Sequence, residues 1–204
     1  MHTVTKKTID YFKTVTLGAF TWRNGERAAL LFAHIRRLGG GWIALHFVLI
    51  TLCLHFPVTL AVARLTPFEL YSRLYGGNFI NALPESARAA LGDSPAMDPA
   101  AVENFNALML ENGYGGNVLP PLLGMALGLT AIIQAVFYLC AVFCLGLSRL
   151  NAEPLSFRER LGLAVFSSTL PVLAAAVFGL FLPTVHIIVF YFIVIFVIFQ
   201  RNNF

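Results

Sequence analysis

The stretch from Val118 to Leu147 has no charged residue over thirty consecutive positions, and Thr130 and Gln134 are its clearly polar side chains. An α-helix rises about 1.5 Å per residue, so a helix of this length exceeds the roughly 30 Å hydrocarbon core of a bilayer and must tilt or extend into the interface. A long charge-free stretch of this kind is typical of a membrane-spanning helix, and the other segments can be placed around it.

Composition agrees with an integral membrane protein. Hydrophobic residues make up 58% of the chain, charged residues only 12%, and the mean hydropathy is +0.76, which lies outside the range of soluble domains. The net charge of +4 comes from basic residues near the expected cytoplasmic surface, where anionic lipid attracts them. With no nucleic-acid motif in the chain, the lipid bilayer is the expected partner and nucleic acid is not.

Apolar stretches predict an all-α, polytopic membrane bundle with four transmembrane helices. Pro183 separates the last two stretches, which would reach about 60 Å as one straight helix, so we expect a tight hairpin there. The predicted spans are residues 42–64, 118–147, 161–182 and 184–199.

The distribution of charge predicts the topology. Residues 1–40 hold seven of the fourteen Lys and Arg residues, whereas residues 66–117 hold six of the ten Asp and Glu residues. By the positive-inside rule, the first segment is cytoplasmic and the second is an external loop, with both chain termini cytoplasmic. We therefore expect a cytoplasmic basic segment, 1–40, followed by a four-span membrane domain, 41–204.

The basic segment contains two amphipathic patterns. Ile9, Phe12, Leu17 and Phe20 line one side of a short helix, and Leu30, Leu31, Ile35 and Leu38 line a second. Such helices either lie in the membrane interface on anionic lipid or pack under the bundle. The sequence leaves both interpretations open.

Helix-start signals mark two further segments. Asp98 and Pro99 have the pattern of an N-cap and a first helical residue, and Gly113 follows the end of that apolar segment, so the external loop should form a small helical cap over the outer face. Ser156 and Glu159 have the spacing of a capping box at the start of the third span.

Polar side chains inside the spans are the candidate functional residues. They are His46, His55, Gln134, Ser167, Ser168, Thr169 and His186. They either form structural hydrogen bonds between helices or line a polar path, and the serines and threonine precede Pro171, which predicts a kink. His46 and His55 are nine positions apart, on opposite faces of one helix, so we expect no metal site and no cofactor.

Small residues at four-residue spacing predict close helix packing. Gly124 and Gly128 form one such step in the second span, and Ala175 and Gly179 form another in the third. The first step permits a helix of the same chain or of another copy to approach closely.

The chain contains no sequence motif of a hydrolase, a nucleotide-binding loop or a zinc enzyme, so we expect no catalytic residues and no enzymatic activity. Its pattern resembles a family of small bacterial four-span membrane proteins of unknown function, some labelled as maltodextrin-utilisation proteins. The resemblance lies in Tyr11-Phe12-Lys13, the order of spans and loop, and Leu155-Ser156-Phe157-Arg158-Glu159-Arg160 followed by Ser168-Thr169-Leu170-Pro171. It implies a bacterial inner-membrane location and association with a solute uptake system.

Together these features predict a non-enzymatic inner-membrane protein that packs with itself or with another membrane complex. The alternative is a small transporter or channel with a polar path near Gln134 and the segment Ser167 to Pro171.

Overall fold

The computed structural model describes residues 2–20, 25–76, 80–81, 83, 85–91, 98–147 and 155–181. The regular secondary structure in these ranges is helical throughout, which confirms the all-α prediction. Contacts divide the chain into two units, residues 1–58 with 127–204 and residues 59–126. Helices α3 (Gly40–Ala63) and α7 (Leu119–Leu147) contribute residues to both units, and each unit is described by itself.

Three helical stretches are long and apolar enough to cross a membrane. They are Gly40–Ala63, Tyr114–Phe143 and Phe157–Gly179, and they correspond to the first three predicted spans. The third begins four positions earlier than predicted, because its first turn includes the charged segment after Ser156. The predicted fourth span, 184–199, and His186 lie outside the described residues.

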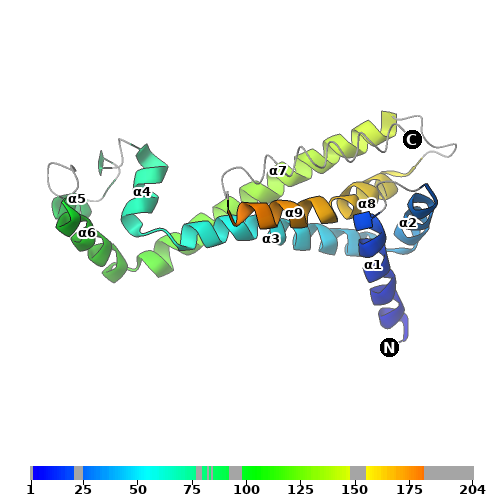
Figure 1. Ribbon diagram of the computed structural model, residues 1–204, viewed down its shortest axis with the longest axis horizontal. Coiled ribbons are helices and arrows are strands. Elements are labelled where there is room, and N and C mark those ends of the chain that lie inside the picture. Colours follow the sequence, from blue (N-terminus) through cyan, green and yellow to red (C-terminus); the bar gives the residue numbers. More distant parts are fainter. Residues whose placement is uncertain are drawn as a thin grey trace. The chain divides into compact units, whose positions relative to one another are not determined.

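The first unit combines the basic segment with the spans. Helices α1 (His2–Phe20) and α2 (Gly25–Arg37) pack on α8 (Phe157–Ser167), which continues into α9 (Thr169–Gly179). Figure 1 shows α1 running across the direction of α3 and α9, which lie along one another. The shared core contains the buried side chains Tyr11, Leu31, Ile35, Leu38, Ile43, Ile50, Leu54, Tyr138, Leu163, Phe166 and Val172.

The two N-terminal helices bury one face each in this core. Tyr11 and Thr14 of α1 are buried, as are Leu31 and Ile35 of α2, so both helices pack against the bundle. Phe12 is exposed, with 64% of its surface accessible, and it belongs to the apolar face that the sequence predicted for α1. An interfacial position for that face stays a prediction.

Two glycines allow these helices to approach α8 closely. A Cβ atom at Gly18 would lie 2.5 Å from the backbone oxygen of Phe166, and one at Gly162 would lie 2.8 Å from the Cγ2 atom of Ile35. Contacts this short are not tolerated between packed atoms. Glycine at both positions therefore determines how closely α1 and α2 pack on α8.

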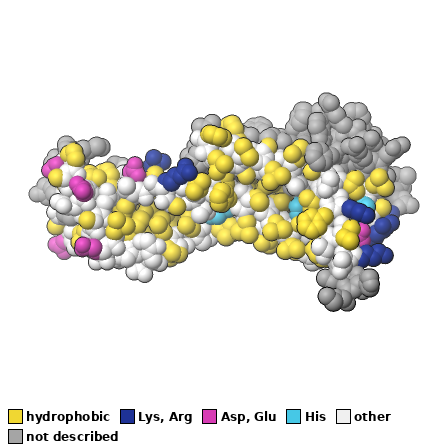
Figure 2. Space-filling model, turned by 60° about the horizontal axis from the view of Figure 1, so that its bottom comes forward, with side chains coloured by type: hydrophobic (Ala, Val, Ile, Leu, Met, Phe, Trp, Pro, Cys, Tyr) yellow, Lys and Arg dark blue, Asp and Glu magenta, His cyan; other side chains and the backbone are white. Residues whose placement is uncertain are grey.

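The outward face of the spans is apolar. Figure 2 shows hydrophobic side chains spread over the surface, with one group of Lys and Arg side chains at the end that carries α1 and α2. On α7, Ile132, Val136 and Phe143 are all more than half exposed. Exposed apolar surface of this extent is expected where lipid or another apolar helix covers it.

The second unit contains the predicted external loop. It holds α4 (Pro67–Tyr75), α5 (Glu85–Leu91), α6 (Pro99–Glu111) and the π-helical turn Tyr114–Val118. Its own core consists of Leu70, Leu83, Ala87, Leu91, Phe105, Met109 and Tyr114. The loop is thus helical with a hydrophobic core, and its position as a cap over the outer face stays a prediction.

The helix-start signals are confirmed where the sequence placed them. The Asp98 side chain accepts a hydrogen bond from the backbone N–H of Ala100, 3.0 Å away, and Pro99 is the first residue of α6. Gly113 follows with a φ of +81°, a left-handed conformation that favours glycine. Sequence reasoning did not identify a second capping box, Thr66 with Glu69, at the start of α4.

Candidate functional site

Polar side chains from α1, α3, α7 and the junction of α8 with α9 meet inside the first unit. Tyr11 comes from α1, His46 and Thr51 from α3, Gln134 and Tyr138 from α7, and Ser168 and Thr169 from the junction of α8 and α9. All seven are buried. They form two chains of hydrogen bonds, which we name the histidine chain and the glutamine chain.

The histidine chain joins α1, α3 and α9. The Tyr11 phenol oxygen lies 2.9 Å from His46 Nδ1, and His46 Nε2 lies 2.9 Å from Thr169 Oγ1. The Thr169 hydroxyl donates to the carbonyl oxygen of Phe166, 2.7 Å away, so its oxygen must accept a hydrogen bond from His46. A neutral His46 then carries its proton at Nε2, and its Nδ1 accepts a hydrogen bond from Tyr11.

Aromatic rings enclose His46 from both sides. The Phe166 ring stacks on the imidazole with a centroid separation of 4.6 Å, and the Tyr11 ring meets the imidazole edge-on at 5.7 Å. Burial also raises the pKa of Tyr11 above its ordinary value of 10.0, so its phenol keeps the proton that it donates. This environment favours a neutral, fixed imidazole.

The glutamine chain joins α3, α7 and α8. The Thr51 hydroxyl proton lies between two acceptors at 2.7 Å, Gln134 Oε1 and the carbonyl oxygen of Phe47. Gln134 Nε2 donates to the Tyr138 oxygen at 3.4 Å.

Tyr138 completes this chain through Ser168. The two hydroxyl oxygens are 2.5 Å apart, and Ser168 Oγ donates to the carbonyl oxygen of Val165 at 2.7 Å. Because the serine proton is used there, Tyr138 is the donor to Ser168. The hydrogen bonds thus run in one direction from Gln134 to the backbone of α8.

The sequence predicted a kink before Pro171, and the helix is interrupted at Ser168, where α8 ends at Ser167 and α9 begins at Thr169. A bend at this point stays a prediction. Proline has no N–H group to donate to the helix carbonyl four residues earlier. For Pro171 that carbonyl belongs to Ser167. The hydroxyls of Ser168 and Thr169 donate to the carbonyls of Val165 and Phe166, three residues before each. The same two hydroxyls accept the ends of the two polar chains.

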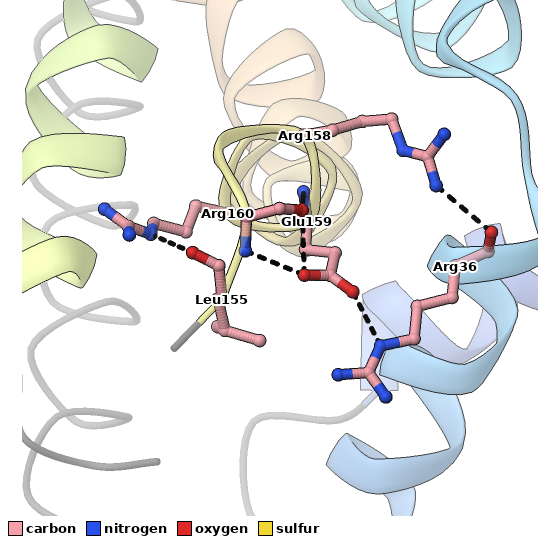
Figure 3. Close-up of polar contacts among 6 residues, drawn as sticks. Arg36, Leu155, Arg158, Glu159 and Arg160 are labelled. Atoms are coloured by element: carbon pink, nitrogen blue, oxygen red, sulfur yellow. Dashed lines mark hydrogen bonds and ion pairs between the residues drawn. The ribbon is translucent and has the colours of Figure 1, made fainter. Parts of the chain in front are cut away.

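A separate charged cluster joins α2 to the start of α8 (Figure 3). Arg36 Nε donates to Glu159 Oε1 at 2.6 Å, while Glu159 Oε2 accepts from the backbone N–H and the hydroxyl of Ser156, both at 2.8 Å. The predicted capping box is confirmed. Its carboxylate also anchors the C-terminal end of α2, a contact that the sequence pattern did not predict.

The structure brings four of the seven predicted polar residues into the two chains: His46, Gln134, Ser168 and Thr169. His55 and Ser167 are buried in the same unit. Among the residues that the structure describes, no group of three or more His, Cys, Asp and Glu residues could hold a metal ion.

The predicted packing residues differ in their surroundings. Ala175 and Gly179 are buried in the first unit. A Cβ atom at Gly124 or Gly128, in contrast, would meet no described atom within 4 Å. The described part of the chain therefore supplies no close helix neighbour for this step on α7.

Sequence reasoning missed Tyr11, Thr51 and Tyr138, each of which completes a polar chain. For Tyr138 a signal existed, because it follows Gln134 by four positions and so lies on the same helix face. Gly162 was missed because it belongs to no four-residue step of small residues, whereas Gly18 follows Thr14 by four positions and this step was overlooked.

Neither a known protein family, nor a curated protein, nor a solved structure matches this chain. The resemblance to small bacterial four-span proteins therefore stays a prediction.

Proposed function

We propose that this chain is a non-enzymatic membrane protein that binds another membrane protein through the exposed face of α7, as an accessory to a complex such as a solute uptake system. The observation that carries the proposal is the open glycine step, where Gly124 and Gly128 have no described neighbour within 4 Å of a Cβ position. Small residues at this spacing let a second helix approach closely in a bilayer, where packing drives association.

The arrangement of the polar residues also supports this proposal. A polar path needs side chains that can exchange hydrogen bonds with water or a solute. In the two chains, His46 instead bonds to Tyr11 and Thr169. Gln134 bonds to Thr51 and Tyr138, and Ser168 bonds to Tyr138 and a backbone carbonyl. In this proposal their role is to hold α1, α3, α7 and the α8–α9 span together.

Chemical crosslinking in native membranes, followed by purification of the chain, tests the proposal. Gly128→Leu adds bulk to the open face and should remove the crosslinked partner. Cys140→Leu is the matched control, because Cys140 is also exposed on α7 but twelve positions away, about 120° around the helix. Equal crosslinking of the partner by wild type and Gly128→Leu would contradict the proposal.

The transporter or channel alternative makes a different prediction. If Gln134 lines a path, Gln134→Leu should abolish uptake or conductance in reconstituted vesicles while the crosslinked partner is retained. Loss of the partner with Gly128→Leu, and no transport by the purified chain, is the outcome that our proposal expects.

A further inference from the structure

A groove lies between α3 and α8 in the first unit, with a volume of about 310 Å³. On the α3 side, Gly40 and Ala44 are spaced by four residues, and their small side chains leave room beside the helix. On the α8 side, the wall consists of Phe157, Leu161 and Val165. The volume is at the lower end of the range for small-molecule sites, about 300 to 1,000 Å³.

The lining is apolar except at one point. Arg158 is the charged residue among those that line the groove, and it stands one position after Phe157 in the first turn of α8. Figure 3 shows its side chain reaching from α8 toward α2, where it donates to the carbonyl oxygen of Arg36 at 3.2 Å. A guanidinium has five N–H donors, so this bond leaves donors for a second acceptor.

No carboxylate in the charged cluster compensates Arg158. Glu159 is the acidic neighbour, and its two oxygens are bonded to Arg36 and Ser156. Lys and Arg side chains also gather at this end of the unit (Figure 2). Among the described residues of this cluster, the two guanidinium groups of Arg36 and Arg158 outnumber the one carboxylate of Glu159, so Arg158 offers a positive charge to an anion at the groove.

The position of the groove indicates which anion fits. It is at the first residues of α3 and α8, where two candidate spans begin and where basic residues predict the cytoplasmic surface. At this depth, apolar walls face acyl chains, and a basic side chain meets lipid phosphates. Anionic lipid is concentrated in the cytoplasmic leaflet.

We propose that the groove between α3 and α8 binds one acyl chain of an anionic phospholipid, whose phosphate is held by the Arg158 guanidinium. The lipid would bridge α3 and α8. Phe47, which lines the groove, also packs edge-on against Tyr138 of the glutamine chain. This inference does not depend on the proposed partner of α7.

The test is lipid retention by the full-length chain. The chain is reconstituted in an equal mixture of phosphatidylglycerol and phosphatidylcholine, repurified in mild detergent, and its bound lipids are measured by mass spectrometry. Wild type should retain phosphatidylglycerol in excess. Arg158→Gln removes the charge and should lower retained phosphatidylglycerol about tenfold, the effect of losing one charge-assisted hydrogen bond of about 1.4 kcal/mol. Ala44→Phe fills the space for the acyl chain and should lower retained phosphatidylglycerol by at least as much.

Two matched controls separate the site from general effects. Arg37→Gln removes an exposed charge outside the groove lining, and Leu45→Phe adds an aromatic ring at the exposed neighbour of Ala44. Both should retain lipid as wild type does, and all variants should keep wild-type helical content. Equal retention by Arg158→Gln and Arg37→Gln, or unchanged retention by Ala44→Phe, overturns the proposal. Dissociation of an oligomer by Ala44→Phe without lipid loss also overturns it, because the occupant is then a second copy.

Discussion

The phenol oxygen of Tyr11 lies 2.9 Å from Nδ1 of His46, and this hydrogen bond joins an N-terminal helix outside the predicted spans to the first span. Through Nε2 of the same imidazole, the connection continues to Thr169, the first residue of α9. The position of α1 is thus coupled to the junction of α8 and α9.

A double-mutant cycle should detect this coupling. Tyr11→Phe leaves the buried Nδ1 atom of His46 without its donor, which costs about 1 to 3 kcal/mol of unfolding free energy. His46→Leu leaves the Tyr11 hydroxyl without its acceptor. The sum of the two single losses in unfolding free energy should exceed the loss of the double variant by about 0.5 kcal/mol or more. Denaturation in detergent micelles measures all three losses. Strict additivity would show that the two side chains do not interact.

The Arg36 to Glu159 ion pair should affect stability asymmetrically. Arg36→Ala removes one partner of a half-exposed pair and should cost about 1 kcal/mol or less. Glu159→Ala also removes the capping box with Ser156 and should cost about 1 kcal/mol more. Thermal unfolding of the two variants measures the difference. Arg37→Ala is the control and should unfold at the same temperature as wild type. Equal losses for Arg36→Ala and Glu159→Ala would contradict the double role of Glu159 in the ion pair and the capping box.

The close packing of α1 on α8 predicts a strong effect of one methyl group. Gly18→Ala places a Cβ atom 2.5 Å from the backbone oxygen of Phe166. A flexible side chain could rotate away from this contact, but a backbone atom within a helix cannot. The variant should lose about 1 to 3 kcal/mol, and limited proteolysis should cut α1 faster. Gly41→Ala is the control, since no described atom lies within 4 Å of its Cβ position, and it should be as stable as wild type. Equal proteolysis of the two variants would exclude a tight contact at Gly18.

Gln134 should contribute to stability as an interhelical hydrogen-bond partner. Gln134→Leu removes the acceptor of Thr51 and the donor to Tyr138, at a cost of about 0.6 to 1.7 kcal/mol. Ile133→Leu, at the exposed neighbouring position, should cost almost nothing. Denaturation in micelles compares the two. A Gln134→Leu variant as stable as wild type would show that these bonds do not hold the helices together.

Hydropathy and charge predicted three of the spans, and local patterns predicted the caps at Asp98 and Ser156 and the helix interruption before Pro171. These features depend on residues close together in the sequence, so a local pattern suffices. The polar chains depend on contacts across large separations. Tyr11 meets His46 35 positions later, and Thr51 meets Gln134 83 positions later.

Helix faces were harder to predict than helices. The apolar face predicted for α1 contains Ile9 and Phe12, which are exposed, whereas the buried face contains Tyr11, Thr14 and Gly18. In a membrane protein, an apolar residue is suited to lipid as well as to the core, so hydrophobicity alone does not identify the buried side. Small and polar residues mark the packed side here.

The central claim is that the polar side chains of the spans form a closed structural network. Cysteine accessibility tests it most directly. Ser168→Cys is made in a chain whose three cysteines, Cys53, Cys140 and Cys144, are replaced by serine, and a water-soluble thiol reagent is added to permeabilised membranes. Ser168 is fully buried, so the new thiol should remain unmodified, whereas Arg37→Cys on the exposed surface of α2 should react rapidly. Rapid modification at position 168 would reveal a water-filled path through the bundle and contradict the account.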